Sequence, residues 1–251
     1  MDPVTAVVLG LLGVATPGVV VTGIVAAVRQ ARRTRREQID LARRHLEFAG
    51  KAGLTFDAIG SRQLFAGLLP LAPFGLGGPR TATNAHHGDW RGRPVTGFCY
   101  TFVVSSFNGS TARTTTHQWC VTTVGLPTEL PPLQVRPRFG RLREAVAPVV
   151  TDDIPLESVD FNRRFHLSCP DARFASAFMH PRMMQRVLDD TGERLVRVDG
   201  ARLVAALPGD PTPDEIRDCW EYLSDLADLI PPFVYRSYGE PPGGPMPTPR
   251  R

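Results

Sequence analysis

The amino-acid sequence predicts an α+β protein with one N-terminal transmembrane helix, followed by a mixed domain with two β-hairpins and a C-terminal amphipathic helix. Three observations support this prediction. The N-terminus carries a long uncharged stretch, the dipeptides Asn108-Gly109 and Asp199-Gly200 stand between strand-like segments, and the last helical segment repeats its apolar residues every three or four positions. Strands in consecutive hairpins, with the helices set apart from them, are typical of α+β domains.

Residues 3–28 contain no charged side chain and predict a membrane-spanning helix. At about 1.5 Å per residue, a helix of this length exceeds the hydrocarbon layer of roughly 30 Å. A buried core helix is rarely so long, and a cleaved signal peptide would carry positive charge before its apolar part, where this chain has only Asp2. We therefore assign residues 1–28 to a retained anchor. Small residues four positions apart, such as Ala6 and Gly10, would allow a weak homodimer through the span.

Residues 29–53 are predicted as a basic juxtamembrane helix. Because positive flanks usually stay in the cytoplasm, we expect a single-pass protein of the cell membrane with its N-terminus outside and its C-terminal domain in the cytoplasm. The arginines provide this topology signal, and in a second interpretation they also contact anionic lipid headgroups, at roughly 1 kcal/mol per basic residue. The residues assigned to that contact are Arg29, Arg32, Arg33, Arg35 and Arg36.

Residues 54–238 are predicted as one α+β domain, whose first hairpin joins strands at residues 93–106 and 111–124. Two registers around the Asn-Gly turn remain open. In one of them, Cys99 and Cys120 lie opposite each other, and their redox state then depends on the compartment. Both registers place six residues on one core-forming face: Phe98, Tyr100 and Phe102 from the first strand, with His117, Trp119 and Val121 from the second.

The rest of the domain is predicted from turn residues, prolines and helical periodicity. Thr212 and Glu215 form a capping box in front of the last helix, and residues 239–251 are rich in Pro and Gly, which indicates a disordered tail. The other predicted elements are an uncharged loop or short helix at 64–79, an extended segment at 126–137, a strand at 158–169, a helix at 171–190 that breaks at Pro181, hairpin strands at 193–198 and 201–207, and a helix at 213–230.

The composition excludes some classes of function. Of 251 residues, 42% are hydrophobic and 22% are charged, close to average globular usage. The formal net charge is +4, and residues 1–50 supply seven arginines against four acidic residues. The remaining chain is nearly neutral, so we expect no nucleic-acid partner, because such binding usually requires a basic face.

Two groups of polar residues are candidates for a catalytic or metal site. They are His86, His87 and Asp89, and Asp152, Asp153 and Glu157. Adjacent histidines with a carboxylate could ligate a metal, and clustered carboxylates could perform acid–base chemistry or bind a divalent cation. Exposed surface histidines and a polar turn explain the same residues more simply. The sequence has no phosphate-binding loop, dinucleotide-binding glycine motif or Gly-x-Ser-x-Gly motif, so we assign no catalytic residue, no metal and no cofactor.

The stretch from Glu157 to Leu207 resembles uncharacterised bacterial, actinobacterial-like single-pass membrane proteins of unknown function. The residues that carry the resemblance are Glu157-Ser158, Phe161-Asn162-Arg163-Arg164-Phe165, Asp171 and Pro181-Arg182-Met183-Met184. The resemblance covers about a fifth of the chain and implies a strand, an acidic turn and a short helix in front of a hairpin. It implies no catalytic residues.

These observations together predict a non-enzymatic, membrane-tethered cytoplasmic domain that binds or scaffolds a protein partner. Two alternatives remain. One is a membrane-anchored enzyme with its site at either group of polar residues named above. The other is a module that binds anionic lipids through the helix Arg29–Arg44.

Overall fold

The computed structural model describes residues 37, 39–66, 77–107, 112–138, 153–191 and 194–240. The chain forms two compact units, residues 1–44 and residues 45–251. In the first unit, residue 37 and residues 39–44 are helical. The second unit begins with helical residues 45–52 and contains every strand and helix described below.

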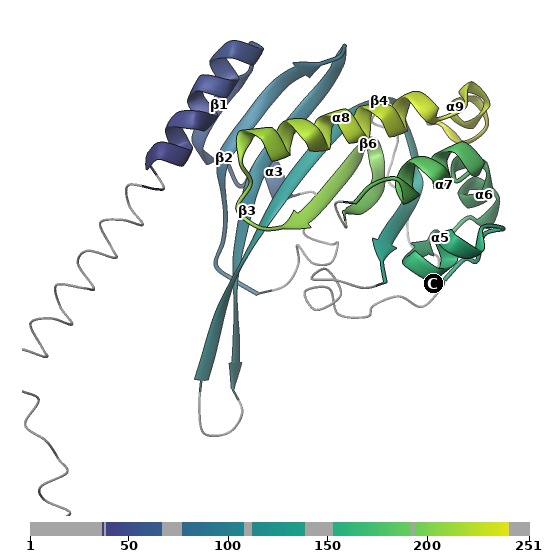
Figure 1. The fold of residues 1–251 in the computed structure, drawn as a ribbon, viewed down its shortest axis with the longest axis horizontal. Helices are drawn as coiled ribbons and strands as arrows, with labels where there is room; N and C mark the ends of the chain where they lie inside the picture. The colour runs from purple at the N-terminus through teal and green to yellow at the C-terminus, as the bar shows by residue number, and fades with distance from the viewer. Residues whose placement is uncertain are drawn as a thin grey trace, which may run out of the picture. The chain divides into compact units, whose positions relative to one another are not determined.

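Within the described ranges, six antiparallel strands form a single sheet (Figure 1). The strand order is β1-β2-β3-β4-β5, and β6 also pairs with β4. β4 is therefore shared by three neighbours, β3, β5 and β6. The strands are β1 (Thr55–Gly60), β2 (Arg80–Trp90), β3 (Arg93–Phe107), β4 (Ala112–Pro137), β5 (Phe165–Ser168) and β6 (Leu195–Pro208).

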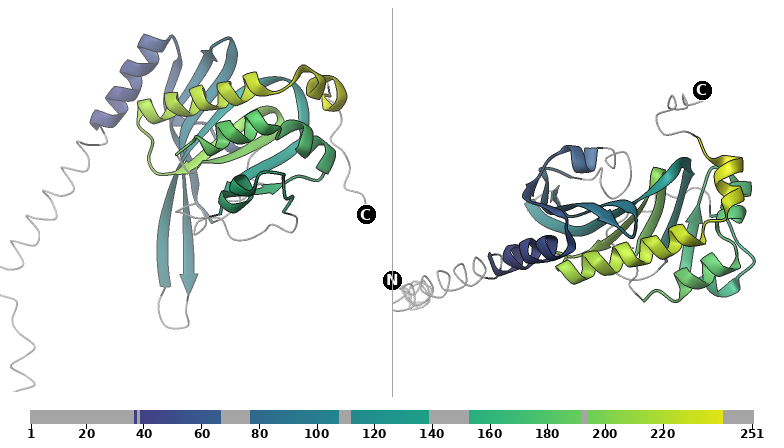
Figure 2. Two further views of the ribbon diagram at one scale, coloured as in Figure 1. Left: turned by 45° about the vertical axis from the view of Figure 1, so that its right-hand side comes forward. Right: turned by 90° about the horizontal axis from the view of Figure 1, so that it is seen from above.

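Helices cover both faces of this sheet, with α8 on one face and the short helix α3 on the other (Figure 2). Trp220 of α8 donates a hydrogen bond from Nε1 to the Thr96 carbonyl of β3 over 3.0 Å. Phe65 of α3 contacts Tyr100 of β3, with ring centroids 5.2 Å apart. The labelled helices are α3 (Gln63–Ala66), α5 (Val159–Arg164), α6 (Ala172–Phe178), α7 (Pro181–Leu188), α8 (Pro213–Leu229) and α9 (Pro232–Tyr238).

The core-forming face predicted for the first hairpin is confirmed. Phe98 lies opposite Val121 and Tyr100 opposite Trp119, and all four side chains are buried on the face that α3 covers. Because successive side chains in a strand alternate between faces, the residues between them point toward α8. Gly97 is one of these, and a Cβ atom there would lie 2.8 Å from Ile216 Cγ2 and 3.0 Å from the Trp220 ring. Glycine therefore lets α8 pack directly on the backbone of β3.

The predicted start of the last helix is also confirmed. Thr212 caps α8, accepting from the Glu215 amide over 3.3 Å, while the Thr212 amide donates to the Glu215 carboxylate over 2.7 Å. The helix stops before Pro231 and Pro232, where α9 begins as an additional element. The apolar side of α8 packs on the sheet, and its acidic side faces outward.

The predicted fold class is wrong in its account of the sheet. Of the two predicted hairpins only the first forms in the described residues, and it belongs to one antiparallel sheet of six strands that carries the domain. The segment around Asp199-Gly200 does not turn back on itself, because β6 runs continuously from Leu195 to Pro208 along β4. Gly200 has φ +59° and lies opposite Leu130, between two shifts of register. The dipeptide thus marks an irregularity inside a long strand. Glycine tolerates positive φ, and it serves here in a break of the strand ladder and not in a hairpin turn.

The segment predicted as merely extended, residues 126–137, is the second half of β4. Proline lacks the amide hydrogen that a strand ladder requires and is confined to edges and bulges. Pro127, Pro131 and Pro132 fall between Gly125 and Leu133, where the β4–β6 register shifts twice. The prolines therefore coincide with interruptions of the ladder, and the strand continues past them.

Other elements lacked a clear local signal. Strands β1 and β2 were not predicted, because most β1 side chains are exposed and a register shift at Asn84 (φ +51°) breaks the alternation of β2. The strand predicted at 158–169 begins instead with α5, which Ser158 caps by accepting from the Phe161 amide. In the predicted tail, Glu240 pairs with Glu129 of β4 through two backbone hydrogen bonds of 2.9 Å.

The predicted transmembrane helix is not supported. No helix in the described part of the chain is long and apolar enough to cross a membrane. Residues 1–28, to which the span was assigned, lie outside the described residues, and so do the five arginines assigned to lipid headgroups. The description of the chain as a single-pass membrane protein is corrected accordingly.

Candidate functional site

The three residues of the first predicted site lie on β2 but do not converge. His86 is fully buried, whereas His87 lies at the surface, with Nε2 3.1 Å from Asp57 Oδ2 of β1. Asp89 is exposed further along the strand. Neighbouring strand residues point to opposite faces, so the two histidines cannot share a ligand. Among the described residues, no group of three or more His, Cys, Asp or Glu is placed to hold a metal ion.

His86 instead forms a buried pair with His45. The Pro211 carbonyl can only accept, so His45 Nε2, at 3.1 Å, carries the hydrogen and donates to it. His45 Nδ1 is then the acceptor for His86 Nε2, 2.9 Å away. Burial, followed by the electrostatic effect of the neighbouring His45 and His87, lowers the pKa of His86 to about 4. The imidazole is therefore neutral near pH 7 and joins helical residues 45–52 to β2.

The second predicted site, the carboxylate group at residues 152–157, has a stabilising role in its described residues. Asp152 lies outside the described residues, and Glu157 is exposed. Asp153 forms an ion pair with Arg138 and lies 2.6 Å from His166 Nδ1 of β5. Partial burial raises the pKa of Asp153, but the Arg138 hydrogen bond and the His166 contacts outweigh burial and hold it below its usual value. This carboxylate fastens the segment before α5 to the strand beside it.

Cys99 and Cys120 are directly opposite on β3 and β4, which selects one of the two registers that the sequence left open. A third buried thiol, Cys219 of α8, accepts from Arg194 Nε over 3.4 Å. The hydrogen bond from Cys120 and the Arg194 guanidinium lower the pKa of Cys219 to about 7. All three are free thiols. They are sealed between α8 and the sheet, so they belong to the core.

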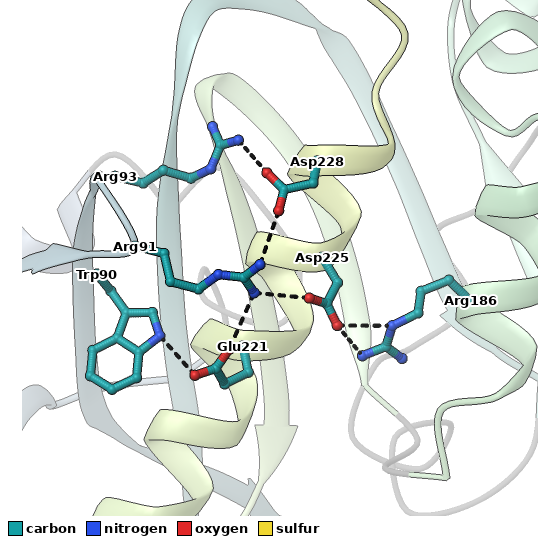
Figure 3. A network of polar contacts seen from close by, with 7 residues as sticks. All are labelled: Trp90, Arg91, Arg93, Arg186, Glu221, Asp225 and Asp228. Atoms are coloured by element: carbon teal, nitrogen blue, oxygen red, sulfur yellow. Dashed lines mark hydrogen bonds and ion pairs between the residues drawn. The ribbon is translucent and has the colours of Figure 1, made fainter.

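Sequence reasoning missed a polar network that joins the turn between β2 and β3 to the outer face of α8 (Figure 3). Arg91 lies at its centre. One guanidinium nitrogen donates to Glu221 at 3.2 Å and Asp225 at 2.9 Å, and the other donates to Asp228 at 3.1 Å. Arg91 and Gly92 have φ values of +51° and +75°, as in a two-residue hairpin turn. This turn aims the arginine at α8.

Two further arginines extend the network. Arg93 of β3 donates to Asp228 over 2.6 Å, and Arg186 of α7 donates to Asp225 over 3.1 Å (Figure 3). Arg186 also lies over the Tyr222 ring, 4.6 Å from its centroid. Three guanidinium groups thus balance three carboxylates across α7, α8 and the β2–β3 turn. A balanced network of this kind orients elements and leaves no charge for a ligand.

We expect Asp225→Asn to lower the free energy of unfolding by about 1 kcal/mol. Exposed ion pairs are worth roughly 0.2–1 kcal/mol each, and Asp225 accepts from two arginines. The matched control is Asp218→Asn on the same helix, which removes a single 3.3 Å contact with Arg217 and should change the free energy by less than about 0.5 kcal/mol. Urea unfolding at low and high salt measures both. Equal losses for the two variants would contradict a role for the network.

One cavity lies on the sheet face that α3 covers. Its volume is about 280 Å³. It opens where the buried aromatic residues of that face end, and it combines residues of the turn before α3 and of α3 with residues of three adjacent strands. The lining residues are Ser61, Gln63, Leu64, Thr96, Thr123 and Arg202. None was predicted as a site residue, because they come from four separate segments with no local motif.

No protein-family model and no curated protein matches the sequence. The fold is similar to the crystal structure of the mycobacterial trehalose monomycolate transport factor A, TtfA, with a TM-score of 0.51. The match covers 80% of this chain and 98% of that chain at 15% sequence identity. At this identity the similarity shows a common fold, and the resemblance to actinobacterial membrane proteins stays a prediction.

Proposed function

We propose that this chain is a non-enzymatic binding domain that takes part in the transport of a sugar-bearing molecule through contact with a protein partner. The observation that carries the proposal is the fold, which matches nearly the whole of a protein named as a transport factor for trehalose monomycolate. Trehalose is an uncharged disaccharide and a mycolate is a long-chain fatty acyl group, so the cargo named there is a sugar-bearing lipid. The two groups of residues considered as enzyme sites favour binding over catalysis, because His86 is buried in the core and Asp153 is held by its ion pair.

The projecting end of the first hairpin is the surface on which we expect the partner. Residues 104–107 of β3 pair with residues 112–115 of β4, and we call these eight residues the arm. Among the described strands, no other strand pairs with the arm, whose edges therefore present backbone donors and acceptors (Figure 1). Phe107 is 72% exposed. A two-stranded ribbon is marginally stable in water, so an extended protein segment along its edge would stabilise it.

The test compares cells that make the chain with cells from which it has been deleted. We expect the deletion to leave the total amount of sugar-bearing lipid unchanged and to reduce the fraction that reaches the outer surface, as measured by labelling and extraction. The full chain should restore that fraction. A chain in which Asn-Gly replaces residues 104–115, so that the Val103–Thr116 pair closes the shortened hairpin, should fold but fail to restore it.

Two results would contradict the proposal. An unchanged distribution of these lipids in the deletion would show that the chain has no part in their transport. A reduced total amount with a normal distribution would indicate a role in synthesis, and hence an enzyme. If the shortened chain fully restored the fraction of lipid at the outer surface, the arm would not be the surface that binds the partner.

A further inference from the structure

We infer that the 280 Å³ cavity binds an uncharged sugar, mono- or disaccharide in size. This inference rests on the proposed function, since it names the part of the cargo that the domain would hold. The site combines two hydroxyl groups and a charge-balanced guanidinium on a wall of three strands with a hydroxyl and an amide from the turn before α3 and from α3.

The chemistry of the sheet face changes abruptly at the cavity. Moving along β3 and β4, the cross-strand pairs Tyr100–Trp119 and Phe98–Val121 are buried and apolar. The next pair on the same face is Thr96–Thr123, which lines the cavity. Two hydroxyl groups thus replace two apolar side chains at the point where the face opens. In the described part of the chain, no side chain hydrogen-bonds to either hydroxyl.

Arg202 of β6 forms the third part of this wall. Its Nε and Nη2 atoms both donate to Asp199 Oδ2, at 2.9 Å and 2.6 Å. The carboxylate holds the guanidinium in place and balances its charge. The irregularity at Gly200, φ +59°, lies between Asp199 and Arg202 on the strand. The Nη1 group keeps its two donors for a ligand. An anionic ligand would be repelled by Asp199, and a cationic one by Arg202, so an uncharged ligand suits the pair.

The turn before α3 and α3 itself supply the opposite side. Ser61 Oγ accepts from the Gln63 backbone amide over 3.2 Å, which fixes the turn before the helix and orients the Ser61 side chain. The Gln63 side chain brings two donors and one acceptor. Leu64 adds an apolar contact, and it packs back toward Gly60, where a Cβ atom would lie 2.7 Å from Leu64 Cδ1.

This set of groups corresponds to the surface of a sugar. Each sugar hydroxyl both donates and accepts, which suits Thr, Ser and Gln side chains, while the C–H face of the ring suits Leu64. Cavities for drug-sized ligands measure about 300–1,000 Å³, so this one falls just below that range and has room for a sugar head but not for a long apolar chain.

The experiment uses the full chain labelled with ¹⁵N, titrated with trehalose and maltose as uncharged disaccharides and with glucose 6-phosphate as the charged comparison. We expect a dissociation constant on the order of 1 mM for an uncharged sugar, with amide shifts concentrated at Leu64, Thr96 and Thr123. Glucose 6-phosphate should bind more weakly than either disaccharide.

The double variant Thr96→Val and Thr123→Val keeps the shape of both side chains and removes both hydroxyls. We expect it to weaken sugar binding at least about tenfold, while its spectrum shows an intact fold. The matched control is Thr114→Val on the arm, which should bind as the original chain does. No shifts at sugar concentrations of about 50 mM, unchanged binding by the double variant, or stronger binding of glucose 6-phosphate would each overturn the inference.

The two proposals fail in different ways. If the deletion alters lipid distribution and no sugar binds, the cavity is excluded and the transport role stands. If a sugar binds as expected and the deletion leaves lipid distribution unchanged, the site stands and the transport role is excluded.

Discussion

Trp220→Ala is expected to lower the free energy of unfolding by about 3–5 kcal/mol, the usual cost of removing a fully buried large aromatic ring. The indole lies where α8 meets the sheet, and its ring centroid is 5.9 Å from that of Trp90 and 6.3 Å from that of Phe48. Alanine would leave a cavity that the rigid sheet cannot fill. Urea unfolding followed by circular dichroism measures the change.

The matched control is Trp220→Phe, which keeps an aromatic ring in place but shortens it and removes the hydrogen bond from Nε1 to the Thr96 carbonyl. We expect a loss of about 1–2 kcal/mol, the cost of the lost hydrogen bond and of the smaller ring. If the two variants lost the same amount, packing of the ring would not be the source of the stability.

Acidification from pH 7 to pH 4 is expected to lower the free energy of unfolding by about 3 kcal/mol through His86 alone. Its pKa falls from the ordinary histidine value of 6.5 to about 4 on folding, and each pKa unit is worth about 1.4 kcal/mol. Between pH 6.5 and pH 4, His86 binds a proton in the unfolded chain but not in the folded chain. The stability that His86 contributes is therefore present in full above pH 6.5, declines between pH 6.5 and 4, and is gone below pH 4.

His86→Gln separates this effect from other titrations. Glutamine places an amide near the original Nε2, where it can still donate to His45, and it does not titrate. Urea unfolding between pH 4 and 7 should give a flatter curve for this variant, whereas His87→Gln at the surface should retain the original slope. A slope that persisted in His86→Gln would show that another group carries the acid sensitivity. Asp153, with its lowered pKa, acts only at more acidic pH.

Sequence reasoning succeeded where a local pattern decides the structure. Alternation around Asn108-Gly109 predicted which residues of β3 and β4 share a face, and the capping box predicted the start of α8. The Asp199-Gly200 dipeptide misled, because pairing of β6 with β4 from Trp119 to Val135 outweighs the local preference for a turn at Gly200. Tertiary pairing routinely overrides such preferences.

The functional residues were harder to find for the same reason. Glu221, Asp225 and Asp228 recur at spacings of four and three, which places them on one face of a helix, but nothing local identifies Arg91 as their partner. The cavity is harder still, since the register of three strands brings Thr96, Thr123 and Arg202 together. A network and a cavity built from long-range pairing leave no contiguous motif.

The central position of β4 has a consequence for the order in which the molecule assembles. β1, β2, β3 and the first half of β4 pair as successive neighbours, so they can associate as soon as residue 124 is available. The other edge of β4 must wait for β6, whose Pro208 pairs with Trp119, 89 residues earlier in the chain. Closing so long a loop is slow, and the unpaired edge is prone to aggregation in the meantime. During synthesis, the half-built sheet therefore depends on the rapid arrival of β6 and α8, and a chain cut short before residue 195 is expected to be recovered as aggregate.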